Sequence, residues 1–196
     1  MAKRSLLSDL QERQGAIFAA QDGWLMPEHF GDPAGEYESV GKSAGLFDLA
    51  DRAMLQFTGD DRLSYLQGML SNDLRSLQVF DGQQAAILTQ QGKVIADVRV
   101  LCSLNSFYLD FWEPLKEKIL NHLNRYLVAD DVEIHDPNEQ WKMLSLQGPK
   151  APAILDRLFA SPELPGNAHH HGMVQFDGSP ARTTHTGLPS NCTMPW

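Results

Sequence analysis

The sequence is poor in cysteine and in long apolar runs, and each shortage excludes a class of protein. The two cysteines, Cys102 and Cys192, lie far apart and outside Cys-x-x-Cys spacing, so they indicate neither a disulfide framework nor a zinc site. No run of about 18 apolar residues occurs, which argues against a membrane-spanning helix. The polar N-terminal segment also lacks the apolar stretch of a signal peptide. These shortages predict a cytoplasmic protein without a membrane partner.

Clustered positive charge is also scarce. The 196 residues carry a formal net charge of −9, and lysine and arginine form no basic stripe, which disfavours a nucleic-acid partner. An acidic surface of this kind mainly serves solubility. The composition is 42% hydrophobic, which is enough apolar material for a folded core. The length predicts one domain or two small ones.

The middle of the chain alternates strands and helices. Period-two patterns predict strands at 53–59, 83–89, 94–102, 107–112 and 131–135. Apolar residues at three- and four-residue steps predict helices that end near 70 and 128, and Asp60 or Asp61 is suited to cap the first. We therefore expect an α+β fold in which a strand-helix-strands-helix-strand unit resembles the ferredoxin-like pattern.

The flanking segments are less regular. Residues 5–14 fit a short amphipathic helix with Leu6, Leu7 and Leu10 on one side. Residues 23–47 are rich in glycine and proline and predict mostly loop, with one helical turn near Glu36–Lys42. Further along, we expect a strand over 141–148, a helix over 149–159, and a hairpin with arms at 173–178 and 181–187.

The first candidate site is Ser71-Asn72-Asp73, which ends the first predicted helix abruptly. Asn and Asp are common after a helix because they tolerate left-handed backbone and hydrogen-bond locally. A carboxylate held at the end of a rigid helix is also suited to orient or deprotonate an amine. The pattern leaves both interpretations of Asp73 open.

Three other segments have two interpretations each. Ala168–Gly172 carries three consecutive histidines, which do not share one face of a helix or strand, so we expect a solvated loop and no metal site. Gly45–Leu49 fits a core strand or a pocket wall. Gly23–Pro27 fits a packed turn, or an aromatic and thioether surface for a flat ligand.

Four of these segments, at 23–30, 44–74, 87–101 and 144–155, follow one another in an order and spacing that resemble the aminomethyltransferase superfamily. This superfamily includes the T-protein of the glycine cleavage system and its YgfZ-type folate-binding relatives. The resemblance covers the N-terminal portion of that family. It implies a first folate-binding domain, incomplete in this sequence, formed by 1–48 and 138–196. It also implies a ferredoxin-like domain, 49–137, inserted into the first.

The resemblance also implies a reaction and a set of residues. In the T-protein, tetrahydrofolate attacks an aminomethyl group on the lipoyl arm of a carrier protein, and ammonia leaves. Asp73 is implied as the catalytic residue, which orients the reactive folate nitrogen and helps its proton move. Trp24 and Met26 would line the approach to the folate channel. The remaining residues implied in folate binding are Asn72, Thr89 and Asp97.

Several departures from the T-protein pattern favour the YgfZ-type branch. Ala50-Asp51-Arg52 replaces the usual Ser-His-Met, and residues 125–134 are closer to YgfZ-type sequences. Members of that branch bind folate but are associated with iron–sulfur cluster assembly or repair, which implies an iron–sulfur protein as the partner. Leu188 stands where the family has a pterin-binding Glu, and leucine cannot accept a hydrogen bond.

Three hypotheses about function follow. The chain is a folate-dependent aminomethyltransferase, a folate-binding accessory protein for iron–sulfur enzymes, or a truncated and catalytically inactive fragment of such a protein. The sequence around Leu188 and after it, which matches no expected motif, is the reason for the third.

Overall fold

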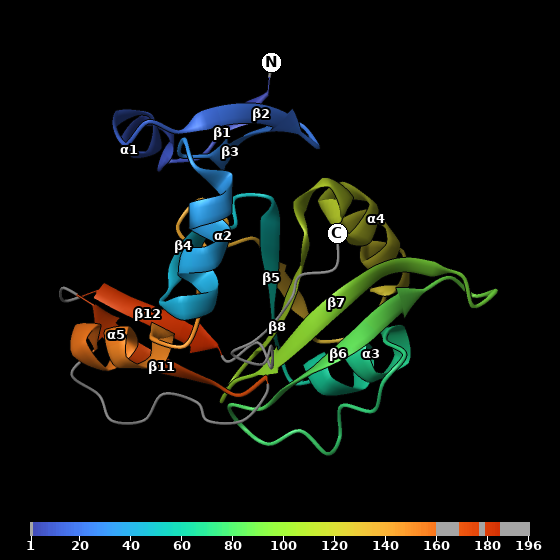
Figure 1. Cartoon of the computed structure of the whole chain (residues 1–196). Coiled ribbons are helices and arrows are strands. Elements are labelled where there is room, and N and C mark those ends of the chain that lie inside the picture. The colour runs from blue at the N-terminus through green and yellow to red at the C-terminus, as the bar shows by residue number, and fades with distance from the viewer. Residues whose placement is uncertain (1, 160–168, 177–178, 185–196) are drawn as a thin grey trace.

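A five-stranded antiparallel sheet is the centre of the computed structural model, which describes residues 2–159, 169–176 and 179–184 (Figure 1). Its strands are β5 (Arg52–Thr58), β6 (Gly82–Leu88), β7 (Val94–Cys102), β8 (Phe107–Trp112) and β9 (Glu133–His135). They lie in the order β6-β7-β8-β5-β9, so the first strand in sequence is inserted between the last two. All five predicted strands are confirmed, with ends that move by at most two residues.

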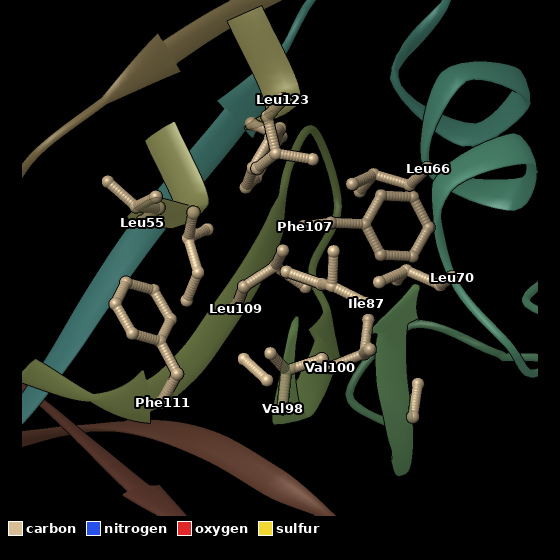
Figure 2. Close-up of a cluster of buried hydrophobic side chains, with 14 of the residues drawn as sticks. Leu55, Leu66, Leu70, Ile87, Val98, Val100, Phe107, Leu109, Phe111 and Leu123 are labelled. Carbon is tan, nitrogen blue, oxygen red and sulfur yellow. The ribbon is translucent and has the colours of Figure 1, made fainter. Parts of the chain in front are cut away.

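Two helices cover one face of this sheet. They are α3 (Arg62–Met69) and α4 (Lys116–Tyr126), and the short 3-10 helix η1 (Glu113–Leu115) leads into the second. Alternate strand residues such as Leu55, Val100 and Leu109 point toward Leu66 of α3 and Leu123 of α4, and all five are buried (Figure 2). Burying each such side chain contributes about 1.5–3 kcal/mol, so this cluster is the main core.

The opposite side of the sheet, called the second face below, carries the other residues of the same strands. A small apolar cluster of Met54, Leu101 and Tyr108 lies there, with Met143 against it. Val94 alternates with the core residues Ala96 and Val98 but is 65% exposed. A register shift at Ile87/Leu88 is the reason, because Ile95 takes the buried position instead.

The start of α3 is not stabilised by the side-chain cap that was predicted for Asp60 or Asp61. Asp61 occupies the N-cap position but accepts no hydrogen bond from the helix. Its Oδ2 accepts from the Asp131 N–H at 2.9 Å, and Asp131 Oδ2 accepts from the Asp60 N–H at 3.2 Å. These aspartates therefore join the beginning of α3 to the loop before β9, and the predicted side-chain cap is wrong.

The N-terminal part forms a separate small sheet, drawn at the top of Figure 1. It contains β1 (Lys3–Arg4), β2 (Ile17–Gln21) and β3 (Trp24–His29), in the order β1-β3-β2. The helices α1 (Ser8–Arg13) and α2 (Pro33–Lys42) accompany it. The expectation of mostly loop over 23–47 is therefore wrong at β3, and the helical turn expected near Glu36–Lys42 is part of the longer helix α2.

The formation of β3 and the full length of α2 have local physical causes. Asp22 and Gly23 have φ of 50° and 85°, the left-handed pair that turns β2 tightly into β3. Asp32 Oδ1 accepts from the Gly35 N–H at 3.1 Å and Pro33 begins the helix, which is a normal start for α2.

The helix α1 presents its polar side inward, contrary to the expected apolar face. Leu6 and Leu10 are 76% and 51% exposed, whereas Gln11 is buried. Gln11 Nε2 donates to Asp48 Oδ2 at 3.2 Å, and Ser5 Oγ donates to the same oxygen. Polar contacts therefore hold α1 in place.

The C-terminal elements begin with a strand that pairs with β4 (Gly45–Asp48), the strand just before β5 in sequence. They are β10 (Leu144–Gln147), α5 (Ala151–Leu158), β11 (His171–Phe176) and β12 (Ser179–Thr184). The last two form the expected hairpin. β10 pairs with β4, so four residues of the segment Gly45–Leu49 form a strand, in which Leu46 is 64% exposed. No helix in the described part of the chain is long and apolar enough to cross a membrane.

Candidate functional site

The segment after α3 lies along the outer edge of β6. The Ser71 N–H donates to Ala86 O at 2.9 Å, and Asn72 Nδ2 donates to Gln84 O at 2.9 Å. The next side chain to enter the core is that of Leu74, which is 1% exposed. Asn72 and Asp73 are themselves exposed. The segment therefore protects a sheet edge and leaves the Asp73 carboxylate in solvent.

Arg75 occupies both carboxylate oxygens of Asp73. Arg75 Nε and Nη2 lie 2.9 and 3.1 Å from Oδ1 and Oδ2, and the Arg75 N–H donates to Oδ1 at 3.0 Å. The hydrogen bonds from the Arg75 side chain lower the pKa of Asp73. At neutral pH this carboxylate is ionised and engaged, in the contacts of a turn-forming aspartate.

Asp97 lies on β7, where strand alternation places it on the second face with Arg99 and Leu101. Its side chain is exposed and has no hydrogen bond or ion pair to any described residue. Thr89 belongs to the turn between β6 and β7, where its Oγ1 accepts from the Lys93 N–H at 3.2 Å. Asp73 and Asp97 therefore do not share a face.

Trp24 and Met26 lie on β3 of the N-terminal sheet. Trp24 Nε1 donates to Glu113 Oε2 at 3.2 Å, and Lys3 Nζ lies 2.7 Å from Glu113 Oε1. These contacts tie the N-terminal sheet to the end of β8. Met26 is half-buried and pairs with Ala19.

The predicted site residues are thus distributed over the fold. Asn72 and Asp73 are neighbours at the β6 edge, Thr89 is in a hairpin turn, and Asp97 is on the second face. Trp24 and Met26 belong to the sheet that Figure 1 shows well away from α3. The described residues do not bring these six side chains into one constellation.

A polar cluster that the sequence did not predict lies on the second face. Asp110 of β8 is completely buried and stands directly opposite Arg99 of β7. Arg52 Nε and Nη2 lie 3.0 and 2.8 Å from Asp110 Oδ1, and Arg99 Nη2 pairs with Oδ2. One signal was present: Asp110 interrupts the apolar run Phe107–Trp112, as a residue facing away from the main core does.

An aromatic and cationic group adjoins this cluster. The rings of Tyr108 and Trp141 are stacked with centroids 5.8 Å apart, and the Arg182 guanidinium lies 4.1 Å from the Tyr108 centroid. Arg182 Nη1 also lies 2.8 Å from His171 Nδ1. Arg182 thereby links the β11–β12 hairpin to the second face.

The three histidines do not behave as one solvated loop. His171 is 2% exposed and its Nε2 lies 2.9 Å from Cys102 O, so the expected loop is wrong there. Burial, reinforced by Arg182, lowers the pKa of His171 to about 4, so the ring is neutral at pH 7. His170 pairs with Asp81 at 2.8 Å. Among the residues that the structure describes, no three His, Cys, Asp or Glu gather in a way that would hold a metal ion.

A hollow of about 550 Å³ opens where β5 and β9 meet. This volume is in the range of small-molecule sites. Thr58 Oγ1 and Glu133 Oε2 lie 3.0 and 3.3 Å from His135 Nε2. Because both contact the same ring nitrogen, the imidazole does not pass a proton from one of these groups to the other. Gln56 joins the hollow to the second face, since it pairs with Tyr108. The lining residues are Gln56, Thr58, Ile134, His135, Asp136, Pro137 and Gln140.

Known proteins have sequences similar to this one. The family model for the GCVT N-terminal domain matches residues 7–187. The chain is 31% identical over 159 residues to the aminomethyltransferase of Bacillus licheniformis, which covers 81% of this chain and 43% of that protein. It is 30% identical over 190 residues to the aminomethyltransferase of Rubrobacter xylanophilus, covering 94% and 50%. The chain spans about half the length of the curated relatives it matches.

Solved structures share the fold. Glycine cleavage system aminomethyltransferase T from Bartonella henselae matches with a TM-score of 0.81 at 21% identity, over 87% of this chain and 47% of that chain. Heterotetrameric sarcosine oxidase from Corynebacterium sp. U-96 matches with a TM-score of 0.57 at 18% identity, over 79% and 78%. At these identities the likeness concerns the fold, and it confirms the α+β class. Since the family model covers nearly the whole sequence, the chain belongs to the GCVT N-terminal domain family.

Proposed function

We propose that this chain binds a tetrahydrofolate on the second face of the five-stranded sheet and serves folate-dependent transfer of an aminomethyl group. The observation that carries the proposal is the gathering of charged and aromatic side chains on that face, beside a hollow of small-molecule size. A folate offers a flat ring system, amine N–H groups and terminal carboxylates. Each has a chemical counterpart among aromatic rings, carboxylates and guanidinium groups.

The name aminomethyltransferase, which the curated relatives carry, supports the reaction class. Tetrahydrofolate supplies, when bound, the amine nitrogen that accepts the one-carbon unit. The protein's part is to orient that nitrogen and to exclude water around it, which strengthens each polar contact. A lipoyl carrier protein is the proposed donor of the aminomethyl group.

Two aspartates are candidates for the carboxylate that meets the folate amine. Asp73 is the residue implied by the sequence, but Arg75 holds both of its oxygens at the β6 edge. Asp97 shares the second face with the arginine and aromatic cluster, and no described residue occupies its carboxylate. We therefore propose Asp97 as the orienting carboxylate. Asp73 serves only if the ligand displaces Arg75.

The proposal includes a domain division and a compartment. A ferredoxin-like domain over 49–137, inserted into a first domain of 1–48 and 138–196, is supported by the pairing of β4 with β10 on either side of the insertion. A cytoplasmic location is supported by the free thiol of Cys102. The iron–sulfur alternative stays a prediction from sequence, and no contact among the described residues favours it.

Calorimetric titration of the whole chain with 5-formyltetrahydrofolate tests the binding step. We expect saturable binding at one site. A chain that unfolds cooperatively, and is therefore folded, but releases no heat with this ligand and gains no thermal stability from it, contradicts the proposal. Formation of methylenetetrahydrofolate from an aminomethylated lipoyl carrier tests the reaction.

A further inference from the structure

Two guanidinium groups on the second face share one carboxylate. Arg52 comes from β5 and Arg99 from β7, on either side of Asp110 of β8. Asp110 is fully buried and each of its oxygens already has a guanidinium partner. The carboxylate is therefore saturated, and it holds both arginines in fixed positions.

Unlike the Asp110 carboxylate, the two guanidinium groups still have N–H donors without a partner on Asp110. Each guanidinium has five N–H donors, and Asp110 accepts only some of them. The Arg99 side chain is 13% exposed, and its buried Nε has no hydrogen-bond partner among the described residues. The Arg52 side chain is 27% exposed, so solvent and ligands reach this pair. One positive charge remains after the pairing with Asp110.

A third cation adds to this charge. Arg182 lies over the ring of Tyr108. Tyr108 is two residues before Asp110 on the same face of β8, so these two residues are about 7 Å apart along the strand. Asp97, two residues before Arg99, is the other carboxylate on the β7 part of this face. Three arginines thus stand against two aspartates, in a protein whose net charge is −9. A bound anion would offset the surplus.

We propose that Arg52 and Arg99 form a carboxylate-binding subsite, and that a carboxylate of the folate glutamyl tail occupies it. The inference rests on the proposed function, because it places the tail of the same ligand on the same face. Planar guanidinium forks match a carboxylate through paired, charge-assisted hydrogen bonds. Asp110 is the positioning residue. Both arginines pair with Asp110, but together they carry one more positive charge than this carboxylate neutralises, and the N–H donors that Asp110 does not accept are the ones the subsite uses.

The first experiment measures anion binding by the whole chain without folate. Sodium glutarate, a dicarboxylate, is titrated at constant ionic strength while the arginine Nε–Hε resonances are followed by NMR. Arg52→Lys and Arg99→Lys assign the two signals. We expect saturable shifts at Arg52 and Arg99 and none at Arg125, an exposed arginine of α4. Shifts that are absent, or that are equal for all arginines, overturn the subsite.

A parallel titration with phosphate tests the chemistry of the anion. Saturation with phosphate but not with glutarate overturns the assignment to a carboxylate. Saturation with glutarate supports a carboxylate site, whether the carboxylate belongs to folate or to another ligand.

The second experiment compares 5-formyltetrahydrofolate with 5-formyltetrahydropteroate, which lacks the glutamyl group. We expect the wild-type chain to prefer the glutamylated ligand by about tenfold, as the loss of one charge-assisted contact implies. Arg99→Met should abolish the preference, and the control Arg125→Met should keep it. If folate binds and Arg99→Met retains the preference, the subsite is wrong and the proposed function stands. If neither ligand binds but glutarate shifts both arginines, the proposed function fails and the anion site stands.

Discussion

Asp110 lies directly opposite Arg99 across neighbouring strands, on the side of the sheet that faces away from the main core. Arg52 completes the pairing from β5, so three adjacent strands each contribute one charged side chain. Charged groups in the middle of a sheet are costly to bury, and this arrangement leaves the Asp110 carboxylate fully paired.

Replacing Asp110 with Asn should destabilise the protein markedly. The substitution keeps the shape of the side chain but leaves two partly buried guanidinium groups without their counter-charge. We expect a loss of about 3 kcal/mol in the free energy of unfolding, the lower end for broken buried ion pairs, because Arg52 is partly exposed. Urea unfolding measures it. Asp156→Asn, at an exposed position of α5, is the matched control and should change stability by less than about 0.5 kcal/mol.

The buried His171 should make stability depend on pH. Its pKa of about 4 in the folded protein lies below the value of 6.5 expected for an unfolded chain. The unfolded state therefore binds a proton first as pH falls. Stability from this group is complete above pH 6.5 and is lost progressively between pH 6.5 and pH 4. The loss should be roughly 2–3 kcal/mol.

Urea unfolding across this pH range checks the His171 prediction. His171→Gln should be less stable at pH 7 and should flatten the pH dependence. His135→Gln, at an exposed histidine, should keep the wild-type slope. An unchanged slope in His171→Gln would assign the pH dependence to other groups.

Gly148 should tolerate no side chain. Its φ is +116°, and an added Cβ would lie 2.5 Å from Val40 O and 2.9 Å from Ala44 Cα. Gly148→Ala should cost at least about 2 kcal/mol, from left-handed strain together with the clash. Gly41→Ala in α2, where nothing lies within 4 Å, should instead stabilise by about 0.5–1 kcal/mol. Thermal unfolding of the two variants should therefore shift in opposite directions.

Local patterns were sufficient for much of the fold. β7 has the predicted bounds Val94–Cys102, and β8 has the predicted bounds Phe107–Trp112, because each is a mostly apolar segment of strand length with a turn before or after it. β3 was missed because it depends on pairing with β1 and β2, and its proline and short length resemble a loop. The inward-facing side of α1 was predicted wrongly because Asp48, which is distant in sequence, accepts a hydrogen bond from Gln11 on the polar side of the helix.

The candidate site was harder to predict than the fold. The sequence named both Asp73 and Asp97 as site residues, but it could not show that Asp73 lies at the outer edge of β6 and Asp97 on the second face. The relation of Arg52, Arg99 and Asp110 depends on the register of three strands. A shift of one residue would put Asp110 into the main core, so only the paired structure reveals the cluster.

The proposal about Asp97 is tested most directly by comparing Asp97→Asn with Asp73→Asn in calorimetric titrations with 5-formyltetrahydrofolate. Both substitutions remove one exposed negative charge, so each controls for the other. We expect Asp97→Asn to weaken binding about tenfold, or about 1.4 kcal/mol, and Asp73→Asn to leave it within about twofold. Binding that is weakened by Asp73→Asn and unaffected by Asp97→Asn would contradict the assignment to the second face. It would place the ligand at the end of α3 instead.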